Sequence, residues 1–241
     1  LQEHLVAKDS LTADVPDHVD SYPLPAAVLQ AAVTQLRNRD YGKLGLIMAQ
    51  PESSLPLLRE AYASASTPEG KLRVAHVLGM MGDGTGIETL LTAIRAVESF
   101  STENISRYFP NISWGHSYVL AAGYSRDPRA LPVILEKAEK LGTAGNYWKD
   151  IKVLAMALEA LGDARATEVI ASYLKKPGAA GNAIQDALTS TRLRGKNGIS
   201  ELVLARVLYN LGDHEGLGEK SLKAFSEDVR GHYRRHALAV L

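Results

Sequence analysis

The stretch Leu72-Arg-Val-Ala-His-Val-Leu-Gly-Met-Met-Gly-Asp83 decides how the chain folds, because its pattern returns twice further along the sequence. The later copies end at Asp163 and Asp213, and both close on the same Gly-Asp pair. Counting back from each Asp, the second, fifth and ninth positions are apolar, a spacing typical of one buried helix face. The eighth position is alanine in all three copies, and we expect this small side chain to admit a neighbouring helix.

The Gly-Asp pair predicts the joint between two helices. Glycine accepts the left-handed conformation that commonly ends a helix, and the Asp side chain then caps the next helix by accepting backbone N–H bonds. A fourth copy ends at Arg126-Asp127; since arginine stands where the others have glycine, we expect this turn to close differently. The glycine-rich segment 82–86 is therefore interpreted as a joint, because a nucleotide-binding loop would require a preceding strand.

A second apolar stripe follows the joints, so each copy is predicted to be a helix pair. Ile87, Leu91 and Ile94 give the clearest example. The four Asp residues lie 44, 36 and 50 residues apart, and two-helix repeats of this length predict an α-solenoid. The fold class is thus all-α, an α-α superhelix: a right-handed stack of antiparallel helix pairs, about five of them by the spacing of the Asp residues.

Outside the clear copies, the apolar spacing predicts five further helices. They cover residues 25–36, 41–49, 54–63, 184–193 and 232–241.

Two regions follow from this division. Residues 1–23 are interpreted as a linker or arm, and residues 24–241 as the repeat domain. The chain starts at Leu1 without an initiator Met, so we expect it to be a fragment of a longer protein.

Composition narrows the classes of partner. The 241 residues are 46% hydrophobic, and the 27 basic and 27 acidic residues balance, whereas nucleic-acid binders usually carry a basic excess. No apolar run approaches the roughly 20 residues that span a bilayer. The absence of cysteine excludes disulfides and thiolate chemistry but fits either cytoplasm or periplasm. We therefore expect neither nucleic acid nor membrane as a partner.

The segment 100–116 interrupts the repeat and supplies the binding candidates. Inserts in solenoids often gather on the binding face, and aromatic residues and arginine are common binding anchors. The candidates are Arg107, Tyr108, Trp114 and His116, with Tyr147 and Trp148 at the start of the next helix pair. The alternative interpretation is a structural brace folded over the repeat edge.

Catalytic and metal sites find little support. His232 and His236 are spaced for one helix face but lack the Glu of an HExxH motif, and two arginines lie between them. Ser117 follows His116, but sequence adjacency is not triad geometry. Segment 17–20 is interpreted as a solvated linker. The basic residues of segment 192–196 are interpreted as cations at the C-terminal end of a helix, where the helix dipole favours them. No catalytic or metal-binding residue is therefore predicted.

The pattern Arg-x-Ala-x-x-Leu-Gly-x-x-Gly-Asp, from Arg73 to Asp83, resembles the HEAT-like repeats named after phycobilisome lyases. The resemblance covers the chain from about residue 40 onward. Because such repeats serve many functions, the resemblance predicts fold better than activity. The repeat, the balanced charge and the lack of a catalytic constellation together favour a non-catalytic module for protein–protein interaction or scaffolding, with a protein or peptide on the concave face.

A second resemblance gives an alternative function. Residues 107–117 (RYFPNISWGHS), 127–136 (DPRALPVILE) and 176–178 (KPG) look like the carboxy-terminal helical region of some bacterial FAD-dependent oxidoreductases. In those proteins a flavin-binding domain precedes the repeats. This resemblance implies an upstream domain of the same polypeptide as the partner and FAD bound by that domain, with no cofactor in this chain.

Overall fold

The structure is a computed structural model that describes residues 24–98, 100, 104–106, 109–141, 148–185 and 197–241. Over these ranges the chain is helical apart from one two-stranded hairpin. The all-α prediction is therefore confirmed at the level of class. The hairpin falls in the interrupting segment, for which the apolar spacing had predicted no regular element.

The first half of the chain contains six helices within the described ranges: α2 (Ala26–Asn38), α3 (Leu44–Met48), α4 (Pro51–Ala63), α5 (Pro68–Met80), α6 (Ile87–Ala96) and α7 (Trp114–Tyr124). The antiparallel hairpin of β1 (Asn104–Ser106) and β2 (Phe109–Ser113) links α6 to α7. The second half continues with α8 (Ala130–Leu141), α9 (Trp148–Leu161), α10 (Thr167–Leu174), α11 (Gly198–Asn210), α12 (Leu217–Ser226) and α13 (Gly231–Val240).

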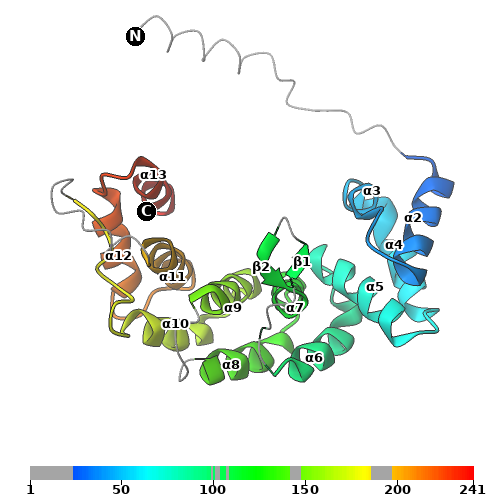
Figure 1. Ribbon diagram of the computed structural model, residues 1–241, viewed down its shortest axis with the longest axis horizontal. Coiled ribbons are helices and arrows are strands. Elements are labelled where there is room, and N and C mark those ends of the chain that lie inside the picture. The colour runs from blue at the N-terminus through cyan, green and yellow to red at the C-terminus, as the bar shows by residue number, and fades with distance from the viewer. Residues whose placement is uncertain (1–23, 99, 101–103, 107–108, 142–147, 186–196) are drawn as a thin grey trace, which may run out of the picture.

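The helices are arranged in an arc, with two rows along most of its length (Figure 1). The inner row consists of α5, α7, α9 and α11, each packed on the next. The outer row consists of α6, α8, α10 and α12, which also contact one another in order. Helices α2, α3 and α4 form one end of the arc, and the hairpin lies on its inner side beside α7 (Figure 1).

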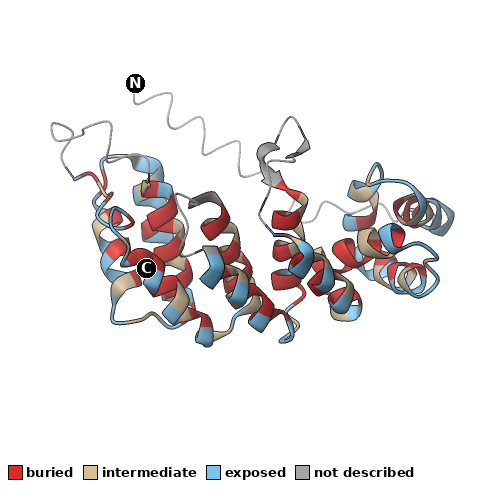
Figure 2. Ribbon diagram, turned by 60° about the horizontal axis from the view of Figure 1, so that its bottom comes forward, coloured by how far each residue is buried: buried red, intermediate tan, exposed pale blue. Residues whose placement is uncertain are grey.

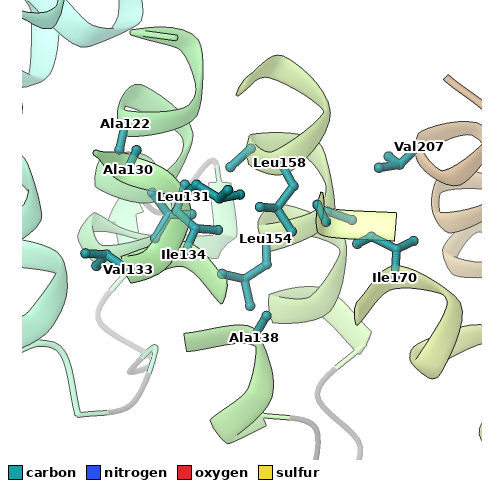
Figure 3. Close-up of a cluster of buried hydrophobic side chains, with 14 of the residues drawn as sticks. Ala122, Ala130, Leu131, Val133, Ile134, Ala138, Leu154, Leu158, Ile170 and Val207 are labelled. Carbon is teal, nitrogen blue, oxygen red and sulfur yellow. The ribbon is translucent and has the colours of Figure 1, made fainter. Parts of the chain in front are cut away.

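The core runs between the rows as one long cluster. Leu154 and Leu158 of α9 are fully buried and meet Ile134 of α8, Ile170 of α10 and Val207 of α11 (Figure 3). Separate clusters occupy each end of the arc. The buried faces turn toward neighbouring helices while exposed residues cover the outside (Figure 2), so each helix pair depends on the next for its burial.

The Gly-Asp joints have the predicted conformation. Gly82, Gly162 and Gly212 all adopt left-handed backbone angles, with φ between +76° and +106°. The expectation for the fourth copy was wrong, because Arg126 takes the same conformation, with φ of +54°. That joint closes as the others do, at the steric cost of a Cβ in the left-handed region.

The Asp side chains cap as predicted, although two of them cap a short 3₁₀ turn rather than an α-helix. Asp83 accepts the N–H of Thr85 at the turn 84–86, and Asp163 accepts that of Arg165 at the turn 164–166. The Arg165 guanidinium also donates two hydrogen bonds to the Asp163 carboxylate. The same arrangement, in which an Asp accepts both the backbone N–H and the guanidinium of the Arg two residues later, occurs at 127–129 and 228–230.

Glycines allow the inner row to pack closely. A Cβ on Gly79 of α5 would lie 2.7 Å from the carbonyl oxygen of Ala121 in α7. A Cβ on Gly123 of α7 would collide with the backbone of Ala157 in α9. Both glycines stand four residues before their Asp, where the two later copies have Glu159 and Tyr209, so these close contacts belong to the first two copies.

The predicted helix 184–193 is wrong where it can be compared. Ile184 and Gln185 are not helical, and residues 186–193 lie outside the described ranges. The Ile184 N–H donates to the Asp228 carboxylate, and its carbonyl accepts the N–H of Val229. These partners in the α12–α13 connection satisfy its backbone groups, so tertiary hydrogen bonds replace the helical ones.

Candidate binding site on the inner row

Four rings meet where the first repeat contacts the second, and we call them the ring cluster: Tyr41, His76, Trp114 and Tyr118. Trp114 stacks on Tyr41 with centroids 5.2 Å apart and on Tyr118 at 6.1 Å, each pair inclined by 25°. The His76 ring lies edge-on to all three. The Trp114 and Tyr rings are half-buried, so they present aromatic surface to solvent.

Hydrogen bonds to His76 fix the ring cluster. Its Nδ1 lies 3.0 Å from the Tyr41 hydroxyl, and its Nε2 lies 2.7 Å from Oγ of Ser117. Burial lowers the pKa of His76 to about 4 and raises that of the Tyr41 hydroxyl. Both groups are therefore neutral near pH 7, and the two hydrogen bonds hold the connection between α2 and α3, together with α5 and α7, in one arrangement.

A cavity of about 340 Å³ opens beside these rings. Three elements supply its walls: the connection between α2 and α3, the first turns of α5, and α7. The lining residues are Arg39, Asp40, Tyr41, Glu69, Leu72, Arg73, Trp114 and Tyr118. The cavity thus combines an aromatic wall with two carboxylates and two guanidinium groups.

Two of these charged groups are held in place by the backbone. Arg73 donates from Nε and Nη2 to the carbonyl oxygens of Leu36 and Arg37, the end of α2. Asp40 accepts the N–H of Gly42 and the amide of Gln35 at one oxygen, Oδ1. The Gly42 N–H is the main cause that lowers the pKa of Asp40, so the carboxylate is ionised near neutral pH.

Of the predicted binding residues, Trp114 belongs to the cavity wall. Arg107, Tyr108 and Tyr147 lie outside the described residues. Trp148 is the first residue of α9, but its side chain is not among those described. These four stay predictions.

His116 lies in the interior rather than on the binding surface. Its side chain is fully buried and stacks on Phe100 with centroids 4.7 Å apart. Its Nδ1 accepts the backbone N–H of Ser113, and its Nε2 lies 2.7 Å from Oδ1 of Asp150. A partner cannot touch this ring directly, but the ring ties the start of α7, where Trp114 stands, to the start of α9.

Ser113, His116 and Asp150 form a hydrogen-bonded trio that the sequence did not reveal. The Ser113 Oγ lies 3.0 Å from Nδ1 of His116 and also accepts the His116 N–H, which makes it the cap of α7. A nucleophilic serine needs a basic nitrogen that is free to accept its proton and an approach for substrate. Here Nδ1 already accepts a backbone N–H and all three residues are buried, so the trio braces two helices.

The other sequence candidates do not gather into a site. His232 and His236 lie on α13, and among the described residues no group of three or more His, Cys, Asp or Glu side chains could hold a metal ion. Segments 17–20 and 192–196 lie outside the described ranges. Within those ranges, every helix is too short or too polar to span a bilayer.

Sequence reasoning missed Tyr41, Arg73, His76 and Tyr118. A signal was present in the repeat itself, since His76 follows the small Ala75 at a position where the copies differ. The repeated apolar positions form the core, and non-repeated polar residues beside them point elsewhere. A comparison of the copies for such differences would have identified His76.

No protein-family model matches the chain, and no curated protein matches it significantly. The resemblances drawn from the repeat pattern therefore stay predictions. Inference of function rests on the geometry of the cavity and the ring cluster.

Proposed function

We propose that the chain is a HEAT-like α-solenoid that acts as a non-catalytic interaction module and binds a protein or peptide segment on its concave side. The two rows of helices and their repeated Gly-Asp joints support this assignment of the fold. The binding surface in this proposal is the ring cluster with its adjoining cavity.

The observation that carries the proposal is the fixed, half-exposed stack of Tyr41, Trp114 and Tyr118. Buried aromatic side chains dominate most protein interfaces because they offer large contact areas with few torsions to freeze. A hydrogen bond between His76 and Tyr41 already orders one of these rings, and the His76 ring lies edge-on to all three. A partner therefore loses little affinity to ordering of this surface.

A random peptide library selected on the intact chain tests this function. Recovered peptides should bind the Trp114→Ala variant at least about tenfold more weakly, the loss typical of an interface hot spot. Tyr124→Ala is the matched control, because Tyr124 lies on the same helix, is 41% exposed and is not part of the ring cluster. Peptides that bind Trp114→Ala and wild type equally well would remove the proposed surface, provided that circular dichroism shows both chains folded.

The alternative, a helical region of a flavin-dependent oxidoreductase, stays a prediction from resemblance. In that case the partner is an upstream catalytic domain of the same polypeptide, and the isolated chain would select no peptide at the ring cluster.

A further inference from the structure

We propose that the cavity beside the ring cluster receives an arginine side chain of the bound peptide. This inference rests on the proposed function and names the ligand class that the same site would take. It combines two features of the cavity: an aromatic wall for a flat guanidinium group, and carboxylates at its rim.

The aromatic wall favours a flat cation. The rings of Tyr41, Trp114 and Tyr118 are inclined by only 25° from one to the next, so they form a stepped surface rather than a cage of crossed walls. A guanidinium group stacks on such a surface by cation–π attraction and planar contact, whereas an ammonium group lacks the planar contact. Tryptophan has the strongest such attraction of the aromatic residues.

The carboxylates supply the charge for that cation. Asp40 uses Oδ1 for its own turn, while the hydrogen bonds of the described residues leave Oδ2 available to the cavity. Glu69 is exposed in the first turn of α5. A guanidinium group has five N–H donors, enough to stack on a ring and bond a carboxylate together.

The two arginines of the cavity do not cancel this preference. Arg73 directs two of its N–H donors at the carbonyl oxygens that end α2, where the helix dipole is negative. Arg39 is exposed and also lines the adjoining surface of α2 with Gln35 and Asn38. His76 adds no positive charge near neutral pH, because burial lowers its pKa to about 4. Arg39 and Arg73 already act on the Asp40 carboxylate and help to lower its pKa, whereas the exposed Glu69 takes part in none of the ion pairs of the described residues. Glu69 is therefore the less engaged carboxylate.

Trp114 fluorescence gives a direct measurement. The chain has two tryptophans, so Trp148→Phe leaves Trp114 as the reporter. This variant is titrated with a capped Gly-Arg-Gly peptide and with peptides that have lysine, citrulline or glutamate at the centre. We expect the arginine peptide to bind best and citrulline, its neutral isostere, about tenfold more weakly, as expected for loss of a charged hydrogen bond and a cation–π contact.

Variants that change the charge of the cavity test whether it prefers a cationic side chain. Asp40→Asn keeps the Oδ1 acceptor of the turn but removes the charge, and Glu69→Gln removes the other carboxylate. Each should weaken binding of the arginine peptide by about twofold to fivefold, and Arg39→Gln should strengthen it by about twofold, as for exposed ion pairs. Binding of the citrulline peptide should not respond to any of the three.

The outcomes separate this inference from the proposed function. Equal affinity for arginine and citrulline, tighter binding of lysine, or loss of binding in Arg39→Gln alone would overturn the arginine pocket. Preference for the glutamate peptide would do so as well, while library peptides that still require Trp114 would leave the proposed function standing. If no peptide changes the fluorescence and library peptides bind Trp114→Ala normally, both fall.

Discussion

Asp150→Ala should be among the most destabilising single substitutions in the chain, because it removes the partner of a buried histidine. Asp150 is 5% exposed and His116 is fully buried. The Nδ1 of His116 accepts the backbone N–H of Ser113, so Nε2 bears the proton that Asp150 accepts. Without the carboxylate, this N–H has no partner inside the protein.

The magnitude follows from the cost of such an orphaned donor. A hydrogen bond to a charged group contributes about 1.5–3 kcal/mol, and an unsatisfied buried donor costs about 1–3 kcal/mol. We therefore expect the free energy of unfolding to fall by about 3 kcal/mol in Asp150→Ala. Asp150→Asn retains an acceptor oxygen and should lose only about 1 kcal/mol. For a chain of this size the larger loss lowers Tm by roughly 6–12 °C.

Urea unfolding followed by circular dichroism measures these differences. Glu168→Ala is the control, since Glu168 is an exposed acidic residue in the first turn of α10 and should change stability by less than about 0.5 kcal/mol. An Asp150→Ala variant as stable as this control would refute the bracing role of the trio. It would also show that the start of α7 keeps its position by other contacts.

Four further substitutions test other features of the fold. Burial lowers the pKa of His76 from 6.5 to about 4, so as the pH falls this residue is protonated in the unfolded chain before it is protonated in the folded one, which favours unfolding. Between about pH 7 and about pH 5, the free energy of unfolding should therefore fall by about 2 kcal/mol more in wild type than in His76→Gln, as measured from urea midpoints. Gly123→Ala should destabilise by at least about 1 kcal/mol because the new Cβ meets backbone, whereas Gly45→Ala, with open space around its Cβ, should stabilise α3 by about 0.5 kcal/mol in thermal unfolding. Arg126→Gly should increase the free energy of unfolding by about 1 kcal/mol, and so raise Tm, because it removes the Cβ from a left-handed residue; an unchanged or lower Tm would contradict the strain.

The sequence predicted the parts of the fold that depend on neighbours along the chain. The joint at Gly162-Asp163 follows from local rules, since glycine accepts positive φ and Asp caps the next turn. The same rules failed at Arg126, which takes the left-handed conformation despite its Cβ in a joint whose two helices, α7 and α8, pack on their neighbours. Tertiary packing overrides local propensity there.

The candidate site depends on contacts far apart in the sequence. Tyr41 and His76 are 35 residues apart, and His116 and Asp150 are 34 apart. No local pattern links such residues, so the insert drew attention to Trp114 but not to its ring partners. The stacking order of the helices must be known before Tyr41 and Tyr118 can be placed on either side of the repeat boundary.

The inner row also suggests where function resides in a repeat of this kind. The residue after the small alanine is His76 in α5, Met156 in α9 and Arg206 in α11. His76 reaches back to Tyr41 and forward to Ser117, and Arg206 reaches back to Glu159 with two hydrogen bonds. The repeated alanine lets the helices approach, and the variable residue after it joins successive helices by a different chemistry in the repeats of α5 and α11. Because this position differs between the copies, the partners that its side chain can take differ as well, and His76 holds Tyr41 and Ser117 at its own repeat boundary.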